Sequence, residues 1–127
     1  MRMWLCDPKI LCRKHLLGEH VEMHMFVGTL LKKKSIIGYL YNNLFEPAML
    51  STRHKQLVEE MKNRGMNHQS EISFDDAFLA YENIQPWYRT WTVERDSALK
   101  DLLSRCPSCL ERCVKLKLEQ GYVYEGI

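Results

Sequence analysis

Three side chains capable of acid–base chemistry occur close together near the beginning of the sequence: His15, Glu19 and Glu22. Their spacings of four and three residues place them on one side of an α-helix. An imidazole and two carboxylates arranged in this way can transfer protons or stabilise a developing positive charge. The same spacing is common on solvated helix faces, so the pattern by itself indicates a candidate site and not an activity.

Five cysteines and five histidines add possible metal ligands. His20 and His24 have the i, i+4 spacing of helical zinc ligands, but they lie on a different helix face from His15, and a surface pair is the simpler interpretation. The segment "CPSCLERC" contains a Cys-x-x-Cys spacing, which is a strong metal signal only when further ligands complete it. The zinc set left open comprises Cys106, Cys109 and Cys113 with Cys12 or Cys6.

Basic residues are clustered although the formal net charge is only +2. Phosphate binding depends on locally exposed positive charge, so a low total does not exclude a nucleic-acid partner. A solvated basic face is the alternative, and residue types alone do not separate the two. The candidates for contacts with a DNA backbone are Lys14, Lys32, Lys33, Lys34, Arg53, His54 and Arg64.

The composition predicts one globular domain over residues 1–127, with 46% hydrophobic and 27% charged residues. No apolar run approaches the roughly 20 residues that cross a bilayer, so we expect no membrane partner. The first residues do not form a secretory signal, and the cysteine count is odd. Both features favour a reducing cytoplasm and disfavour disulfides.

The hydrophobic pattern has a period near 3.6 residues and contains no extended strand pattern. Asp7 and Pro8 form a helix start, and Gly65 stands where a helix is expected to stop. The fold class expected is mainly α, a single compact domain of three principal helices with irregular connections. We expect helices over about 8–33, 51–64 and 93–105, a connection without regular structure over 34–50, and a tail that is partly helical to about residue 119.

Two blocks of sequence resemble the pyrimidine dimer DNA glycosylase family, of the phage endonuclease V type. The first is "MRMWLC…KHLLGEHVEMHMFVG", in which the family has a basic residue beside its catalytic terminus, a histidine, and a glutamate three residues after another glutamate. The second is "MLSTRHKQLVEEMKNRGMN", which aligns without a gap to a basic family helix ending in Arg-Gly-aromatic-Asn. A weaker similarity covers residues 97–107.

The resemblance implies a compact, mostly helical DNA repair enzyme that is both a glycosylase and an abasic-site lyase. Met1 then supplies the nucleophilic α-amine, which forms a Schiff base with the sugar, and Glu22 is the catalytic acid. Arg2 is the basic neighbour of the terminus, His15 belongs to the pocket or is a core histidine, and Glu19 is a structural partner. The implied substrate is duplex DNA with a cyclobutane pyrimidine dimer, and the implied enzyme is a monomer without metal or organic cofactor.

The residues are suited to this chemistry. An α-amine ordinarily has a pKa of about 7.7–8.0, against about 10.4 for lysine, so a substantial share of such amines is neutral and nucleophilic at cellular pH. Because Arg2 is bulky, we expect Met1 to be retained. The chain has only to fold back over six residues to bring Met1 to Glu22.

The sequence departs from the family pattern at Val21 and Met25, where arginines flank the catalytic glutamate in the phage-type enzyme. Two alternatives therefore stay open: the same imine chemistry on another damaged or modified pyrimidine, or a DNA-binding module without catalysis. Tyr122 and Tyr124 are candidates to stack on an unstacked base. Trp87, Tyr88 and Trp91 are expected to pack in the core or in a lid.

Overall fold

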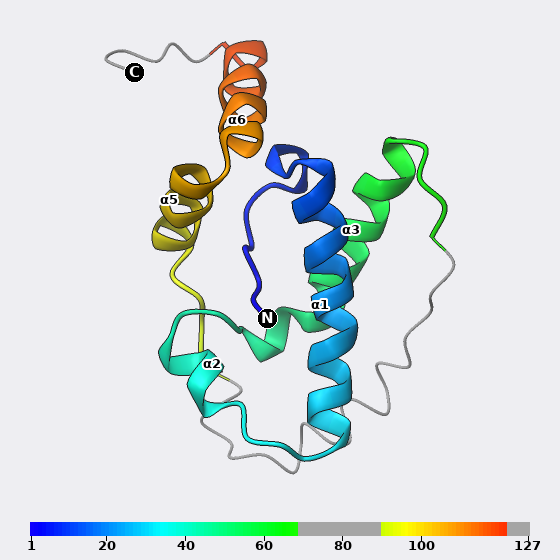
Figure 1. The fold of residues 1–127 in the computed structure, drawn as a ribbon, viewed down its shortest axis with the longest axis vertical. Helices are drawn as coiled ribbons and strands as arrows, with labels where there is room; N and C mark the ends of the chain where they lie inside the picture. Colours follow the sequence, from blue (N-terminus) through cyan, green and yellow to red (C-terminus); the bar gives the residue numbers. More distant parts are fainter. Residues whose placement is uncertain (69–89, 122–127) are drawn as a thin grey trace.

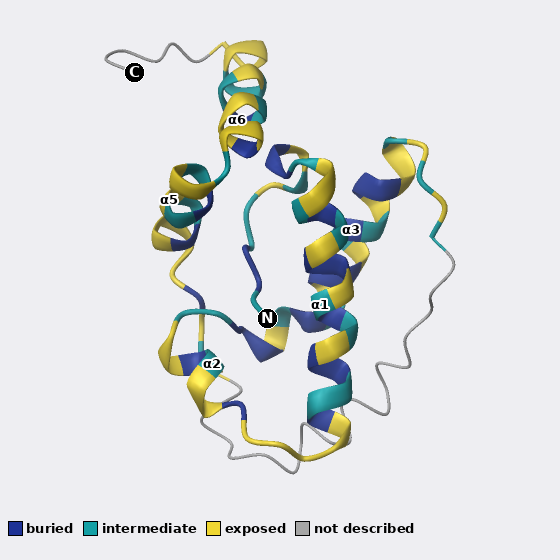
Figure 2. Cartoon of the chain, in the orientation of Figure 1, coloured by how far each residue is buried: buried dark blue, intermediate teal, exposed yellow. Residues whose placement is uncertain are grey.

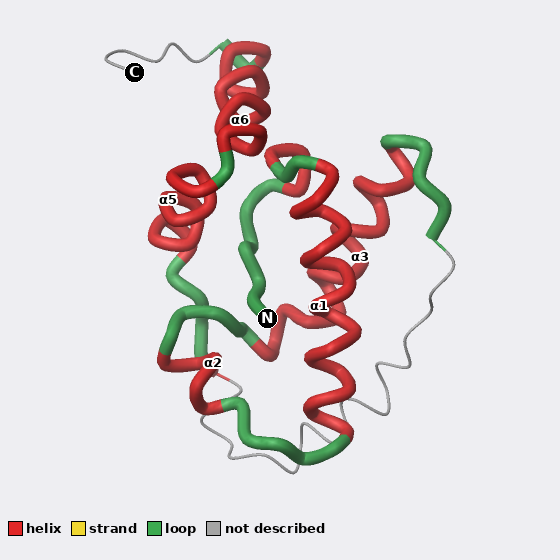
Figure 3. Tube along the Cα trace, viewed as in Figure 1, coloured by secondary structure: helices red, strands yellow, loops and turns green. Residues whose placement is uncertain are grey.

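The computed structural model describes residues 1–68 and 90–121, and within these ranges every regular element is helical (Figure 3). This confirms the mainly α prediction. Trp87, Tyr88, Tyr122 and Tyr124 lie outside the described residues. In chain order the elements are the 3-10 turn η1 (Pro8–Ile10), α1 (Arg13–Leu31), α2 (Ile37–Tyr41), the 3-10 turn η2 (Pro47–Met49), α3 (Leu50–Asn63), α5 (Arg95–Arg105) and α6 (Pro107–Glu119).

The expected helix over 8–33 is divided into η1 and α1, so that prediction was wrong at its beginning. The Asp7 side chain accepts a hydrogen bond from the Lys9 amide at 3.0 Å and starts η1 as expected, but Leu11 is extended. Arg64, the residue directly after α3, donates to the carbonyl oxygens of Pro8 and Leu11, at 3.1 and 2.7 Å. These carbonyls are therefore engaged by a distant side chain instead of continuing a helix.

The connection over 34–50 is more regular than expected, because it contains α2 and η2. The turn η2 continues directly into α3, since Leu50 already has helical backbone angles. For this reason α3 needs no side-chain cap, and Ser51 lies inside its first turn. Gly65 has a φ of +77° directly after α3, which is the left-handed stop that the sequence predicted.

Two helices near the carboxyl end follow the predicted order. The Glu94 side chain caps α5 by accepting from the amides of Asp96 and Ser97. Pro107 begins α6, and the Cys106 sulfur accepts from the Cys109 amide. The predicted helical part of the tail is confirmed, since α6 ends at Glu119, and α6 is a fourth substantial helix beside the three expected.

The core lies where α1 faces α3 and the first seven residues of the chain. Phe26 and Phe45 stack at its centre with ring centroids 4.0 Å apart. Along α1 buried residues recur every three to four positions, as expected for a helix with one buried face (Figure 2). The remaining large core side chains include Met3, Leu11, Leu16, Met23, Leu30, Ile36, Leu40, Leu57 and Leu102.

Apart from Leu5, whose φ is +53°, the first seven residues form an extended segment that runs between α1 and α5 (Figure 1). The Met3 amide donates to the Leu44 carbonyl at 2.7 Å, and Arg53 of α3 donates to the Cys6 carbonyl at 2.7 Å. Arg53 also makes two hydrogen bonds to Glu19 of α1, at 2.6 and 2.9 Å. One buried guanidinium therefore connects α3, α1 and the terminal segment.

Among the described helices, none is both long and apolar enough to span a membrane.

Removing one partner of the Arg53–Glu19 pair should strongly destabilise the fold. Both side chains are at most 1% exposed, so Arg53→Met leaves a carboxylate buried without its cation. We expect a loss of about 3–5 kcal/mol in the free energy of unfolding, measured by urea denaturation.

The matched control is Arg105→Met. Its pair with Asp101 is exposed, with 67% of the Arg105 side chain accessible, and its loss should change stability by no more than about 1 kcal/mol. Equal effects of the two substitutions would show that the buried pair does not support the fold.

Candidate active site

The three side chains that the sequence placed along one side of α1 meet three different neighbours. Glu22 faces the terminal segment, Glu19 faces Arg53 of α3, and His15 lies among cysteine thiols. The three side chains lie along α1 as their spacing predicts, but each contacts a different neighbour, so they do not form one site.

A hydrogen bond from the first peptide group connects the amino terminus to Glu22. The backbone N–H of Arg2 donates to Glu22 Oε2 at 3.1 Å, which holds Met1 beside the carboxylate. Burial raises the pKa of Glu22, while the Arg2 amide and the positive charge of the terminus act in the opposite direction. The result is a carboxylate with a raised proton affinity next to a primary amine.

The Arg2 side chain is turned away from Met1 and towards α5. Its Nη1 donates to Asp101 Oδ2 at 2.7 Å, and its guanidinium lies 3.6 Å from the centroid of the Trp4 ring. Both contacts hold the peptide that binds Glu22. Neither Asp101 nor Trp4 was singled out from the sequence, because nothing local pairs them with Arg2.

An open hollow of about 460 Å³ lies beside Met1. It carries two cationic side chains and one aromatic ring, so its wall offers both positive charge and a stacking surface. Its lining residues are Met1, Met25, Gly28, Thr29, Lys32, Lys34, Ser35 and Tyr39. The hollow thus brings together Met1 and two of the predicted DNA-binding lysines.

The other predicted DNA contacts are distributed differently. Lys33 is exposed beside the hollow residues Lys32 and Lys34. Lys14 is exposed in the first turn of α1, and about 27 Å of helix separates it from Lys32. Lys14 therefore lies away from the hollow.

Three of the predicted DNA contacts have partners inside the protein. Arg53 is 1% exposed and paired with Glu19, and His54 is 5% exposed among other histidines. Arg64 bonds to Glu60 at 2.7 Å and to two backbone carbonyls. Arg53 and His54 are therefore buried, whereas Arg64 is half-buried with its guanidinium bonded inside the protein.

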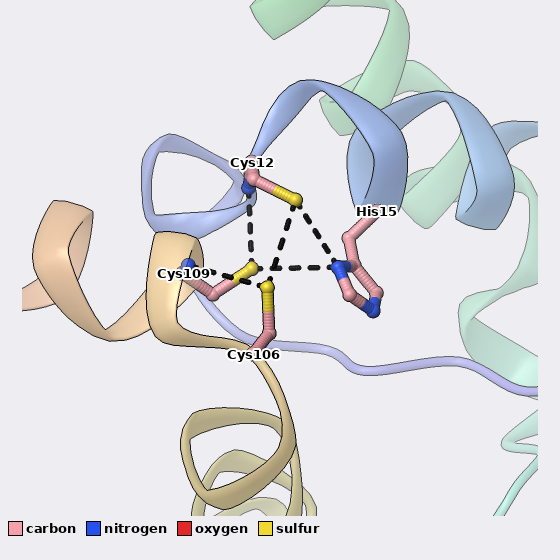
Figure 4. Close-up of side chains that lie close together, drawn as sticks. All are labelled: Cys12, His15, Cys106 and Cys109. Carbon is pink, nitrogen blue, oxygen red and sulfur yellow. Dashed lines mark hydrogen bonds between the residues drawn. The ribbon is translucent and has the colours of Figure 1, made fainter.

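Three thiols surround the imidazole of His15, and we call these four side chains the thiol–imidazole group (Figure 4). Its members are Cys12, His15, Cys106 and Cys109, whose ligand atoms all lie within 4.8 Å of one another. The sequence contained a signal for this group, because Cys12 and His15 have the same spacing as Cys106 and Cys109. That repeated spacing was not recognised.

Four imidazoles form a second group, the histidine cluster of His20, His24, His54 and His68, with ligand nitrogens also within 4.8 Å. The predicted surface pair is therefore part of a larger set. His20 Nε2 and His24 Nε2 are 3.3 Å apart, and His54 packs against His20 with ring centroids 5.0 Å apart. Burial and the neighbouring imidazoles lower the pKa of both His20 and His54 to about 4.

The first part of the chain matches a known family. Residues 1–74 match the family described as pyrimidine dimer DNA glycosylase, which confirms the resemblance seen in the sequence. The matched part includes Met1, Glu22 and the lining of the hollow, whereas Asp101 and two thiols of the thiol–imidazole group lie beyond it. No curated protein and no solved structure matches the chain.

Acidification should destabilise the protein through the histidine cluster. His20 and His54 titrate near pH 4 in the folded chain and near 6.5 when unfolded. The unfolded chain therefore binds more protons between these values, and the free energy of unfolding should decrease as the pH falls from about 6.5 to about 4. Urea denaturation at several pH values, with a chelator present, measures this dependence.

The variant with His20→Gln and His54→Gln should lose part of this dependence. If wild type and variant lose equal stability on acidification, the destabilisation does not originate in the cluster.

Proposed function

Because the chain belongs to the pyrimidine dimer DNA glycosylase family, we propose that it removes a damaged pyrimidine from duplex DNA and then nicks the strand at the abasic site. The observation that carries this proposal is the 3.1 Å hydrogen bond between the Arg2 amide and Glu22. It supports a site in which the α-amine of Met1 is the nucleophile and Glu22 is the acid–base group.

In the first proposed step the neutral α-amine attacks C1′ of the damaged nucleotide. A bond forms between the Met1 nitrogen and C1′, and the bond from C1′ to the base breaks with its electron pair leaving on the base. The Glu22 carboxylate stabilises the positive charge that develops on the sugar. Loss of an amine proton and opening of the sugar ring leave a Schiff base on Met1.

The second proposed step is β-elimination from this Schiff base. A proton leaves C2′, and the bond from C3′ to its phosphate oxygen breaks, which nicks the strand on the 3′ side. Glu22 is suited to transfer the protons because it lies beside the terminus and burial raises the pKa of its carboxyl group above the ordinary value. Arg2 is a positioning residue, since its amide and side chain hold the terminus between Glu22 and Asp101.

The hollow beside Met1 is the proposed place for the damaged nucleotide. Its volume of about 460 Å³ lies within the range of small-ligand pockets. The C1′ atom of a nucleotide stacked inside a duplex is poorly accessible to the amine, so the nucleotide would have to be rotated out of the stack. Lys32 and Lys34 at the hollow can bind the flanking phosphates, and the exposed Lys33 can add to this charge.

A second lesion class is favoured by one observation. Val21 and Met25 are 54% and 49% exposed on α1, where the phage-type enzyme carries arginines, and Met25 lines the hollow. Apolar side chains at these two positions suit a damaged or modified pyrimidine other than a dimer. The chemistry at Met1 and Glu22 would be unchanged.

Borohydride trapping tests the reaction class and the lesion together. The protein is mixed with ultraviolet-irradiated duplex DNA and, separately, with duplex DNA that contains an abasic site, and borohydride is added to each. A covalent adduct that maps to Met1 on both substrates is the expected result. A serine inserted before Met1 displaces the amine by one residue and should abolish the adduct.

The other outcomes select among the alternatives. An adduct on the abasic duplex alone favours another damaged pyrimidine. Binding to both duplexes without any adduct supports a DNA-binding module and contradicts the proposed chemistry.

Substitution of Glu22 should separate catalysis from binding. Glu22→Gln preserves an acceptor for the Arg2 amide but removes the charge and the titratable proton, so strand nicking should fall at least about 100-fold. DNA affinity, measured by fluorescence anisotropy, should be unchanged. The matched control is Glu59→Gln on α3, where an exposed carboxylate is replaced. Unchanged nicking by Glu22→Gln would remove this residue from its proposed role.

A further inference from the structure

Two identical short spacings meet in the thiol–imidazole group. Cys12 and His15 lie at the beginning of α1, and Cys106 and Cys109 lie at the beginning of α6. The two pairs are 94 residues apart in the sequence, yet their side chains point towards one another (Figure 4). Such paired short spacings, each at a helix beginning, are typical of structural zinc sites.

Two of the distances within the group match those between tetrahedral zinc ligands. Bonds of about 2.3 Å to sulfur and 2.05 Å to nitrogen place two sulfurs about 3.8 Å apart and a sulfur and a nitrogen about 3.6 Å apart. The Sγ atoms of Cys12 and Cys106 are 3.8 Å apart. His15 Nδ1 lies 3.2 Å from Cys12 Sγ and 3.6 Å from Cys109 Sγ.

The alternative of a disulfide does not fit the group. A disulfide requires about 2.05 Å between sulfurs, and the cysteines of the group are all free. Thiols are also weak hydrogen-bond donors, so three thiols around one imidazole form only weak hydrogen bonds with it and with one another. Thiolates bound to a cation would satisfy the same positions better.

The backbone around the group is arranged to stabilise negative sulfur. The Cys12 amide donates to Cys109 Sγ at 3.2 Å, and the Cys109 amide donates to Cys106 Sγ at 3.4 Å. Both amides lie at helix beginnings, where the helix dipole favours negative charge. A neutral imidazole at His15 supplies the fourth lone pair for such a cation.

We propose that this chain binds one structural Zn²⁺ between the beginnings of α1 and α6. Its four ligands are Cys12, His15, Cys106 and Cys109. Four protein ligands complete a tetrahedron and leave no open position for substrate, so the ion is structural and not catalytic. On binding, the three thiols release their protons to solvent, and no electron transfer is involved.

The proposed ion would connect the family-like part of the chain to the helices beyond it. Two of its ligands belong to the matched residues 1–74, and two lie in the later part. α5 precedes α6 directly and carries Asp101, which holds Arg2 beside Glu22. The zinc site would therefore stabilise the position of α5, to which Arg2 is bonded.

Zinc content of the purified, dialysed protein tests the proposal. Wild type should contain one equivalent of zinc that the Cys106→Ser, Cys109→Ser double variant lacks. The matched control replaces Cys6 and Cys113, the two cysteines outside the group, by serine, and it should retain this equivalent. Equal zinc in the double variant and wild type would overturn the proposal, whatever the histidine cluster binds.

Cobalt replacement provides a test that does not require the double variant to fold. Wild-type protein loaded with Co²⁺ should show thiolate-to-cobalt charge-transfer absorption in the near ultraviolet, together with the intense visible bands of a tetrahedral site. Imidazoles alone give no thiolate charge transfer, so the histidine cluster cannot produce this signal. Folded, Co²⁺-treated wild type without the charge-transfer band would refute the site.

Discussion

The arrangement of this protein depends on one buried guanidinium. Arg53 lies where α1, α3 and the extended terminal segment meet, and it bonds to Glu19 and to the Cys6 carbonyl. An extended segment outside any sheet has backbone groups that need partners when they are buried. Arg53 donates a hydrogen bond to one of these groups, the Cys6 carbonyl, while its own charge is neutralised by Glu19. The position of the amino terminus follows from this anchor.

Chain termini usually fray, because few contacts restrain them. Here the first two residues are held from both sides: α1 supplies the Glu22 carboxylate, and α5 supplies Asp101 for the Arg2 side chain. This fixation matters for the proposed chemistry, since a nucleophile held close to its acid–base partner does not have to be ordered again in each reaction. The terminus is thus positioned by contacts that lie far apart in the sequence.

The histidines illustrate how tertiary contacts change the interpretation of a helix pattern. His15 shares a helix side with Glu22, but α6 brings two cysteines to it, so it belongs to the thiol–imidazole group. His20 and His24 have the spacing of a simple surface pair, but α3 and the residue at position 68 complete a partly buried cluster. In both cases the neighbour from another element decides the chemistry that is available.

The sequence by itself determined the helical class, the main helices, the family and the candidate pair of Met1 and Glu22. These follow from local periodicity, capping residues and short motifs, all of which depend on residues close together in the sequence. Only the tertiary structure decided which basic side chains are used inside the protein. Arg53 and His54 are buried, and the half-buried Arg64 bonds to backbone carbonyls, although the sequence offered all three as DNA contacts. Burial depends on packing between residues such as 19 and 53 or 12 and 106, and no local pattern specifies contacts at that separation.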